Sequence, residues 1–94
     1  MKYFALFYDV VDNFADKRMP FREPHLKLIN EAHQRGEIVM AGPLGDPLEQ
    51  AMIIFRAADA STPENFARND PYVKQGLVKN WRVKPWNVVV GGTQ

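Results

Sequence analysis

Residues 2–10 limit the fold of this chain more than any other segment. Their sequence, KYFALFYDV, is rich in aromatic and branched side chains, which favour a β-strand. Alternate positions place these side chains on two faces, and both faces are largely apolar. A strand of this kind is covered on both sides. We therefore expect it to lie in the centre of a sheet that has no fully solvated face.

Residues 37–44 and 51–58 are predicted to form the next two strands. Gly45-Asp46-Pro47 lies between them and has the composition of a turn, so the two strands are expected to pair as an antiparallel hairpin. Residues 51–58 again carry apolar side chains on both faces, which indicates a second central strand. Gly42-Pro43 in the other strand indicates an edge position or a bulge, because proline cannot donate to a ladder.

Before this hairpin, a helix is predicted from about Arg22 or Pro24 to Arg35. Apolar residues recur there at helical spacing, and Pro24 suits a first turn. Residues 11–21, which precede this helix, are polar and irregular and are expected to form a loop. The helix therefore follows the first strand after a long connection.

After the hairpin, a second helix is expected to begin within residues 61–64 and to end at about Arg68. The sequence STPE there places a hydroxyl N-cap before proline, with a glutamate in the first turn. A last strand is predicted over residues 78–90, and Pro85 makes it another edge strand or marks a bulge.

The resulting order of elements is βαββαβ. Right-handed crossovers then give an α+β, ferredoxin-like fold with an antiparallel sheet in the strand order 4-1-3-2. This order places both proline-bearing strands at the edges and both doubly apolar strands in the centre. We expect residues 1–94 to form a single domain of this kind.

The composition excludes several classes of function. Twelve basic and eleven acidic residues give a formal net charge of +1. This charge produces no strong electrostatic field that would attract nucleic acid or an anionic membrane. The chain has no cysteine, so disulfides, thiolate nucleophiles and zinc–thiolate sites are excluded. The first residues do not read as a signal peptide, and no apolar run approaches the roughly 18 residues of a membrane span. A cytoplasmic location is expected.

One face of the predicted sheet is left without helices. Two helices cover only one face of a four-stranded sheet, and the other face would carry apolar residues from the first, third and fourth strands. Exposed, this patch would be larger than monomers usually present. We therefore expect a homodimer that packs sheet against sheet and buries the patch with two-fold symmetry.

Asp70 and His25 are the candidate residues for proton transfer. Asp70 stands directly before Pro71, which is the arrangement of a helix N-cap, and Gly76 ends the short turn that follows. His25 falls in the first turn of its helix, where the helix dipole disfavours the imidazolium form. A neutral ring can accept a proton, and a nearby carboxylate would orient it. A structural role for either residue stays open: Asp70 as a cap, and His25 as a hydrogen-bonded side chain at the rim.

The remaining polar signals are weaker. His33 lies eight residues after His25, which is not the spacing of four that lets one helical face bind a metal, so no metal site is expected. His33 is expected at the surface, near the end of its helix. Arg22 lies one turn before His25 and would bind an anionic substrate or lie on the surface.

Several short motifs together resemble one known family. They are Arg22-x-x-His25-Leu26, Gly36-x-Ile38, Ala41-Gly42-Pro43-Leu44, Asn69-Asp70-Pro71-Tyr72 and Gly76-Leu77. In this order and at these spacings the chain is similar to the YciI-like (YCII-related) family over nearly its whole length. The resemblance implies a dimeric α/β barrel-type assembly, similar to muconolactone isomerase, and it places the family's proposed His–Asp pair on His25 and Asp70.

The resemblance also implies a chemistry. The best-characterised activity of the family is the dehydrochlorination of a chlorinated hydroxyhydroquinone in aromatic degradation. One departure lies in residues 45–50, which lack the Gly-Ser pair that many members carry before the third strand, so a substrate role for that serine does not transfer to this chain.

The leading hypothesis is a cofactor-independent lyase or isomerase that acts on a small oxygenated ring. His25 would move a proton while Asp70 orients and charges it. Further residues are expected to hold the oxygens of the substrate or to stack on its ring: Arg22, Gly42, Pro43, Leu44 and Tyr72, with Phe21 or Trp86 as other stacking candidates. The alternative is a non-catalytic ligand-binding or accessory protein. RNA binding is disfavoured, because residues 51–58 lack the basic and aromatic pattern that stacks bases.

Overall fold

The computed structural model describes residues 1–92, in which four strands form one antiparallel sheet. The strand order is β2-β3-β1-β4, which is the predicted order 4-1-3-2 read from the other edge. The strands are β1 (Lys2–Val10), β2 (Ile38–Leu44), β3 (Gln50–Ala57) and β4 (Val78–Trp86). Both proline-bearing strands lie at the edges, as expected, and β2 and β3 form the predicted hairpin.

The prediction that the last strand reaches residue 90 is wrong. β4 ends at Trp86, which pairs with Tyr3 of β1. β1 begins at Lys2, so beyond Trp86 the chain has almost no further residues of β1 to pair with. Valines at positions 88–90 have strand propensity but no neighbouring strand to pair with, and pairing decides where a strand ends.

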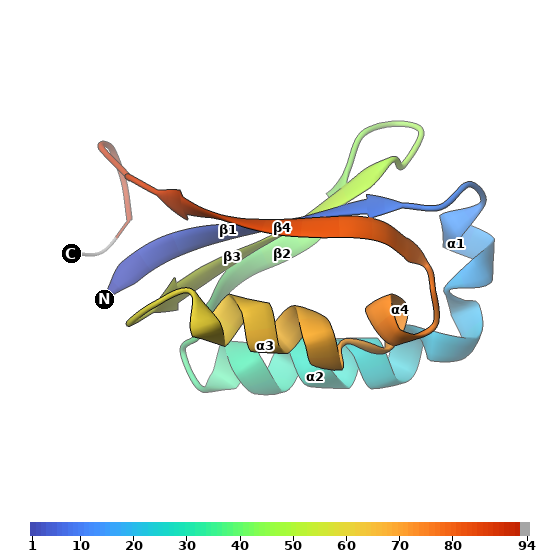
Figure 1. Cartoon of the computed structure of the whole chain (residues 1–94), viewed down its shortest axis with the longest axis horizontal. Coiled ribbons are helices and arrows are strands. Elements are labelled where there is room, and N and C mark those ends of the chain that lie inside the picture. The colour runs from blue at the N-terminus through green and yellow to red at the C-terminus, as the bar shows by residue number, and fades with distance from the viewer. Residues whose placement is uncertain (93–94) are drawn as a thin grey trace.

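The helices lie on one side of the sheet (Figure 1). They include α2 (Arg22–Gln34), α3 (Ser61–Asn69) and the single turn α4 (Pro71–Lys74). Within residues 1–92, no helix combines the length and apolar character needed to cross a membrane. The bounds of α2 and α3 match the prediction to within about one residue.

The segment predicted as a loop before α2 is instead structured. It contains α1 (Phe14–Lys17) and a 3₁₀ turn over Met19–Phe21. Phe14 is buried, and its ring meets the ring of Tyr72 edge-on with 5.2 Å between centroids. Asn13 takes the left-handed conformation that starts α1, with φ at 59°. One apolar anchor gives no periodic pattern, which is why the sequence did not predict this turn.

The start of α3 also differs from the prediction. The expected hydroxyl cap is absent, because Ala60 is the N-cap residue and Ser61 already lies inside the helix. Asp59 replaces it, since its carboxylate accepts hydrogen bonds from the backbone N–H and the hydroxyl of Ser61. These bonds satisfy one of the free donors of the first turn.

The core fills the space between the helices and the facing side of the sheet. The register of β1 with β3 pairs Phe4 with Phe55 and Leu6 with Ile53, so the apolar side chains of both strands lie on the face that points toward the helices. Side chains from the helices complete this layer. Its largest buried members include Phe4, Leu6, Tyr8, Ile53, Phe55, Phe66 and Tyr72.

The opposite side, which we call the helix-free face, is also apolar. It is formed by Ala5, Phe7, Met40, Leu44, Met52, Ile54 and Trp86. Met40 is 65% exposed and Trp86 is 45% exposed. Among these apolar residues, Arg82 forms an ion pair with Asp9, and its guanidinium lies 5.0 Å from the ring centroid of Phe7.

Candidate active site

Asp70 caps α4 and is completely buried. Its backbone is extended, with φ −69° and ψ 125°, and its Oδ1 accepts a 3.0 Å hydrogen bond from the backbone N–H of Tyr72. Pro71 follows at the first helical position, as predicted. The exposed fraction of Asp70 is 0%, so its carboxylate needs hydrogen-bond partners within the protein. These partners come from three segments of the chain.

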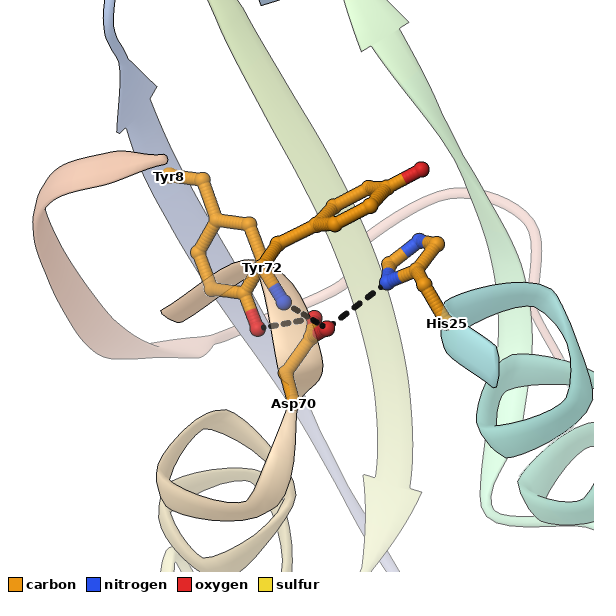
Figure 2. Close-up of polar contacts among 4 residues, drawn as sticks. All are labelled: Tyr8, His25, Asp70 and Tyr72. Carbon is orange, nitrogen blue, oxygen red and sulfur yellow. Dashed lines mark hydrogen bonds and ion pairs between the residues drawn. The ribbon is translucent and has the colours of Figure 1, made fainter. Parts of the chain in front are cut away.

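His25 is one of these partners. Its Nδ1 lies 2.8 Å from Oδ1 of Asp70, although 45 residues separate the two. Because this carboxylate accepts hydrogen bonds, Nδ1 is the nitrogen that carries the proton in the neutral form of the ring, and Nε2 then has the lone pair. Nε2 points away from Asp70 (Figure 2). The side chain of His25 is 13% exposed, so a small molecule can reach this nitrogen.

Tyr8 is a partner that the sequence did not reveal. Its hydroxyl donates a 2.8 Å hydrogen bond to Oδ2 of Asp70 from the helix-facing side of β1 (Figure 2). Burial, together with the charge of Asp70 and this hydrogen bond, raises the pKa of Tyr8 well above its usual value near 10. Tyr8 therefore stays protonated and keeps donating to the carboxylate at all physiological pH values.

Tyr72 fixes the plane of the histidine ring. The two rings stack with 3.8 Å between centroids and 11° between planes. Phe14 supports Tyr72 from the side. Since the hydrogen bond to Asp70 fixes one edge of the imidazole and the stack fixes its plane, His25 has little rotational freedom.

A cavity of about 260 Å³ opens beside this cluster. This volume is just below the roughly 300–1,000 Å³ of typical ligand pockets, so it fits a single ring. Its walls come from β1, α1, α2, β2, β3 and α4. The lining residues are Tyr8, Phe14, Arg18, Arg22, His25, Leu26, Ile29, Ala41, Gly42, Pro43, Ala51, Ile53 and Tyr72.

The cavity includes most of the residues expected to bind a substrate. Arg22, Gly42, Pro43 and Tyr72 all line it. Leu44 does not, because side chains alternate along β2 and Leu44 lies on the helix-free face with Met52.

The two other stacking candidates are also absent from the cavity. Trp86 pairs with Tyr3 and lies on the helix-free face. Phe21 directly precedes α2 and packs against the core. Among the aromatic candidates named from the sequence, Tyr72 is therefore the one that lines the cavity.

Arg18 is a second lining residue that the sequence did not single out. It ends α1, and its guanidinium lies 5.6 Å from the ring centroid of Phe14. The signal for Arg18 was its spacing of four residues from Arg22, but this spacing carries meaning only once residues 18–22 are known to be helical turns.

The chemistry of the site rests on proton-transferring groups. In residues 1–92, no three side chains of the types that bind metals gather in one place. His33, the other histidine, is exposed, and its Nδ1 lies 2.8 Å from the backbone carbonyl oxygen of Ile38. The arrangement can accept a proton at Nε2 of His25 and stabilise the imidazolium through Asp70.

Comparison with known proteins gives a family match for the chain. The YCII-related domain matches residues 1–87 of the chain. A relative in Haemophilus influenzae, named only as an uncharacterized protein, is 27% identical over 96 residues, which cover 93% of this chain and 98% of the relative.

Two solved structures share the fold. The first is 5-chloro-2-hydroxyhydroquinone dehydrochlorinase (TftG) of Burkholderia phenoliruptrix, in complex with 2,5-dihydroxybenzoquinone. It has a TM-score of 0.74 and 20% identity, over 90% of this chain and 93% of the other. The second, a protein of Agrobacterium tumefaciens, has a TM-score of 0.54 and 14% identity, over 93% and 92%. These likenesses show the fold, which a small-molecule enzyme also uses.

Proposed function

This chain belongs to the YCII-related domain family, and we propose that it is a cofactor-independent lyase or isomerase that transfers protons on a small oxygenated ring. The observation that carries the proposal is the contact between Nδ1 of His25 and the buried carboxylate of Asp70, which leaves Nε2 as a base beside a cavity. A base held in this way by a carboxylate is the arrangement that general acid–base catalysis requires.

Dehydrochlorination is the reaction that we propose for the site. The structural neighbour is named for 5-chloro-2-hydroxyhydroquinone, and the cavity fits one ring of that size. Nε2 of His25 takes the proton of the hydroxyl beside the chlorinated carbon. That oxygen becomes a carbonyl, and the chlorinated carbon receives a proton from the imidazolium.

The second step releases chloride. The hydroxyl para to the new carbonyl loses its proton to water, its oxygen becomes the second carbonyl, and a ring double bond moves toward the chlorinated carbon. Chloride leaves with the electron pair of the carbon–chlorine bond. The net change is loss of HCl. The two carbons that become carbonyls are oxidised, and the carbon that exchanges chlorine for hydrogen is reduced by the same amount, so no external oxidant is needed.

Each residue of the cluster has a role in this scheme. Asp70 orients the ring of His25 and stabilises its charged form. Tyr8 holds Asp70 through the hydrogen bond to Oδ2. Tyr72 stacks on His25 and lines the cavity, and Arg22 with the backbone of Gly42 and Pro43 contacts the oxygens of the substrate.

We further propose that the protein acts as a homodimer joined through the helix-free face. No helix packs on this face in Figure 1. The face is apolar, and Met40, Leu44 and Trp86 are exposed on it. Apolar patches of this size on proteins usually mark an interface. A second copy of the chain buries the patch with two-fold symmetry.

The test is chloride release from 5-chloro-2-hydroxyhydroquinone, followed with an ion-selective electrode and by absorbance of the quinone. We expect turnover by the wild type and a fall of about 10²–10⁴-fold in His25→Ala. His33→Ala is the matched control, because His33 lies on the same helix outside the cavity, and it should keep full activity. Equal turnover by His25→Ala and the wild type would refute the proposal. Ligand binding without turnover would instead favour the non-catalytic alternative.

A further inference from the structure

Two arginines give the cavity a positive charge that no carboxylate in its lining balances. Arg18 and Arg22 both line it, beside His25. Among residues 1–92, the ion pairs join other residues and include neither arginine. The carboxylate of Asp70 lies behind His25, outside the lining, and its hydrogen bonds go to Tyr8, His25 and the backbone of Tyr72. The cavity is therefore an anion-attracting space.

The guanidinium of Arg18 also holds an unused donor. Its Nε is buried, and it has no hydrogen-bond partner in the part of the chain that the structure describes. A buried donor without an acceptor destabilises the fold, so such groups are rare in folded proteins. An acceptor in the cavity removes this cost once the side chain of Arg18 turns its Nε toward it.

The charges of both arginines act at Tyr72. Burial raises the pKa of the Tyr72 phenol, while Arg18 and Arg22 oppose this change by favouring the phenolate. Both guanidinium groups are therefore close enough to influence the ring that stacks on His25. A negative charge bound by them lies in the same cavity as the base.

We infer that the ring is bound in an anionic form, with its negative charge on a carboxylate or on an ionised hydroxyl, and that Arg18 and Arg22 bind this charge. The guanidinium fork matches two coplanar oxygens, which both groups present, and such charge-assisted hydrogen bonds are the strong ones. This inference rests on the proposed function where it places the reacting edge of the ring against His25. The preference for an anion is a property of the cavity alone.

Binding of matched ring compounds tests the inference by titration calorimetry, without any turnover. One pair is 2,5-dihydroxybenzoate and 2,5-dihydroxybenzamide, which differ in a carboxylate. The other is 2-hydroxy-1,4-benzoquinone and 2-methoxy-1,4-benzoquinone, which differ in an ionisable hydroxyl. At neutral pH we expect the anion of at least one pair to bind about 10- to 100-fold more tightly than its neutral partner. The pair that shows the difference identifies the source of the charge.

The variants show whether the arginines cause this difference. Arg18→Gln and Arg22→Gln should each remove most of it, whereas Arg18→Lys should keep part, because it retains the charge but lacks Nε. Lys17→Gln is the control, since Lys17 is exposed, adjacent to Arg18 and outside the cavity. Thermal unfolding confirms that each variant is folded before binding is compared.

The outcomes separate this inference from the proposed function. Equal affinity for the anionic and neutral partners in both pairs, or an anion preference unchanged in folded Arg18→Gln and Arg22→Gln, overturns the inference whatever the activity is. An anion preference that depends on the arginines, in a protein that releases no chloride, supports the inference and refutes the dehydrochlorinase proposal.

Discussion

Tyr8 donates a 2.8 Å hydrogen bond to Oδ2 of Asp70, a residue 62 positions later in the chain. The bond joins a central strand to the turn between α3 and α4 (Figure 2). It therefore couples the position of the carboxylate to the sheet, and through the carboxylate the position of His25.

Replacing Tyr8 with phenylalanine should lower the free energy of unfolding. The buried carboxylate loses one of its donors, which costs about 1–3 kcal/mol near neutral pH. Urea denaturation of the wild type and Tyr8→Phe at pH 7 measures this difference. An unchanged midpoint in urea would show that the hydrogen bond adds nothing to stability.

The same variant should change how stability depends on pH. Because the pKa of Tyr8 is raised on folding, the unfolded chain releases this proton near pH 10 while the folded protein retains it. Stability is therefore fully present below pH 10 and falls above it, by about 1.4 kcal/mol per pH unit for this group. The advantage of the wild type over Tyr8→Phe should shrink between pH 10 and 11. A difference that stays constant with pH contradicts the linkage.

Two substitutions at Asp70 should separate its roles as a cap and as a charge. Asn caps about as well as Asp, so Asp70→Asn should stay folded and keep the hydrogen bond from Tyr72. Its chloride release should fall about 10²–10⁴-fold, because the imidazolium of His25 loses its counter-charge. Asp70→Ala should lose about 0.5–2 kcal/mol of stability in addition, as the cap is removed. Full turnover in Asp70→Asn means that the residue is only a cap.

The turn after α4 should depend on glycine at position 76. The backbone there has φ of 76°, a left-handed conformation that costs other residues about 1–2 kcal/mol. A β-carbon at Gly76 would meet no atom within 4 Å, so Gly76→Ala isolates this backbone term. Gly42→Ala is the control, because Gly42 has equal space and no positive φ. Equal stability of the two variants in urea would refute the explanation.

The proposed dimer should be sensitive to charge on the helix-free face. Met40 is 65% exposed, so Met40→Glu should leave the monomer folded, but it would bury an unpaired charge in the dimer at a cost of about 3 kcal/mol or more. Met19→Glu is matched in chemistry and in exposure, and Met19 lies in the 3₁₀ turn away from this face. Sedimentation equilibrium at micromolar concentration should show a dimer for the wild type and Met19→Glu, and dissociation for Met40→Glu. A monomeric wild type contradicts the proposed assembly.

The sequence predicted the fold because several independent signals agreed. The doubly apolar strands and the prolines of β2 and β4 predicted the order of the sheet, and the structure confirms it. The pair of Asp70 with Pro71 predicted a capped turn, which is also present. The contact between His25 and Asp70 was expected because the start of the first long helix and the segment before the last strand can meet at one end of such a sheet.

Other parts of the site have no local signal. Tyr8 looks like any core aromatic of a central strand, and only its neighbour across the fold gives its hydroxyl a role. Arg18 lies in a segment without periodicity, so its turn could not be predicted. Leu44 was assigned to the site as part of its motif, and Trp86 as an aromatic side chain that could stack on the ring. Strand alternation and pairing register place both on the helix-free face.

The central claim is that His25 exchanges a proton with a carbon of the bound ring. Hydroxyhydroquinone without chlorine has no leaving group, so in D₂O under nitrogen it isolates this step, which NMR follows as deuterium entering the ring. We predict that the wild type and His33→Ala accelerate this exchange well above the rate in buffer, and that folded His25→Ala does not. Exchange by His25→Ala as fast as by the wild type, or a wild type no faster than buffer, would contradict the account.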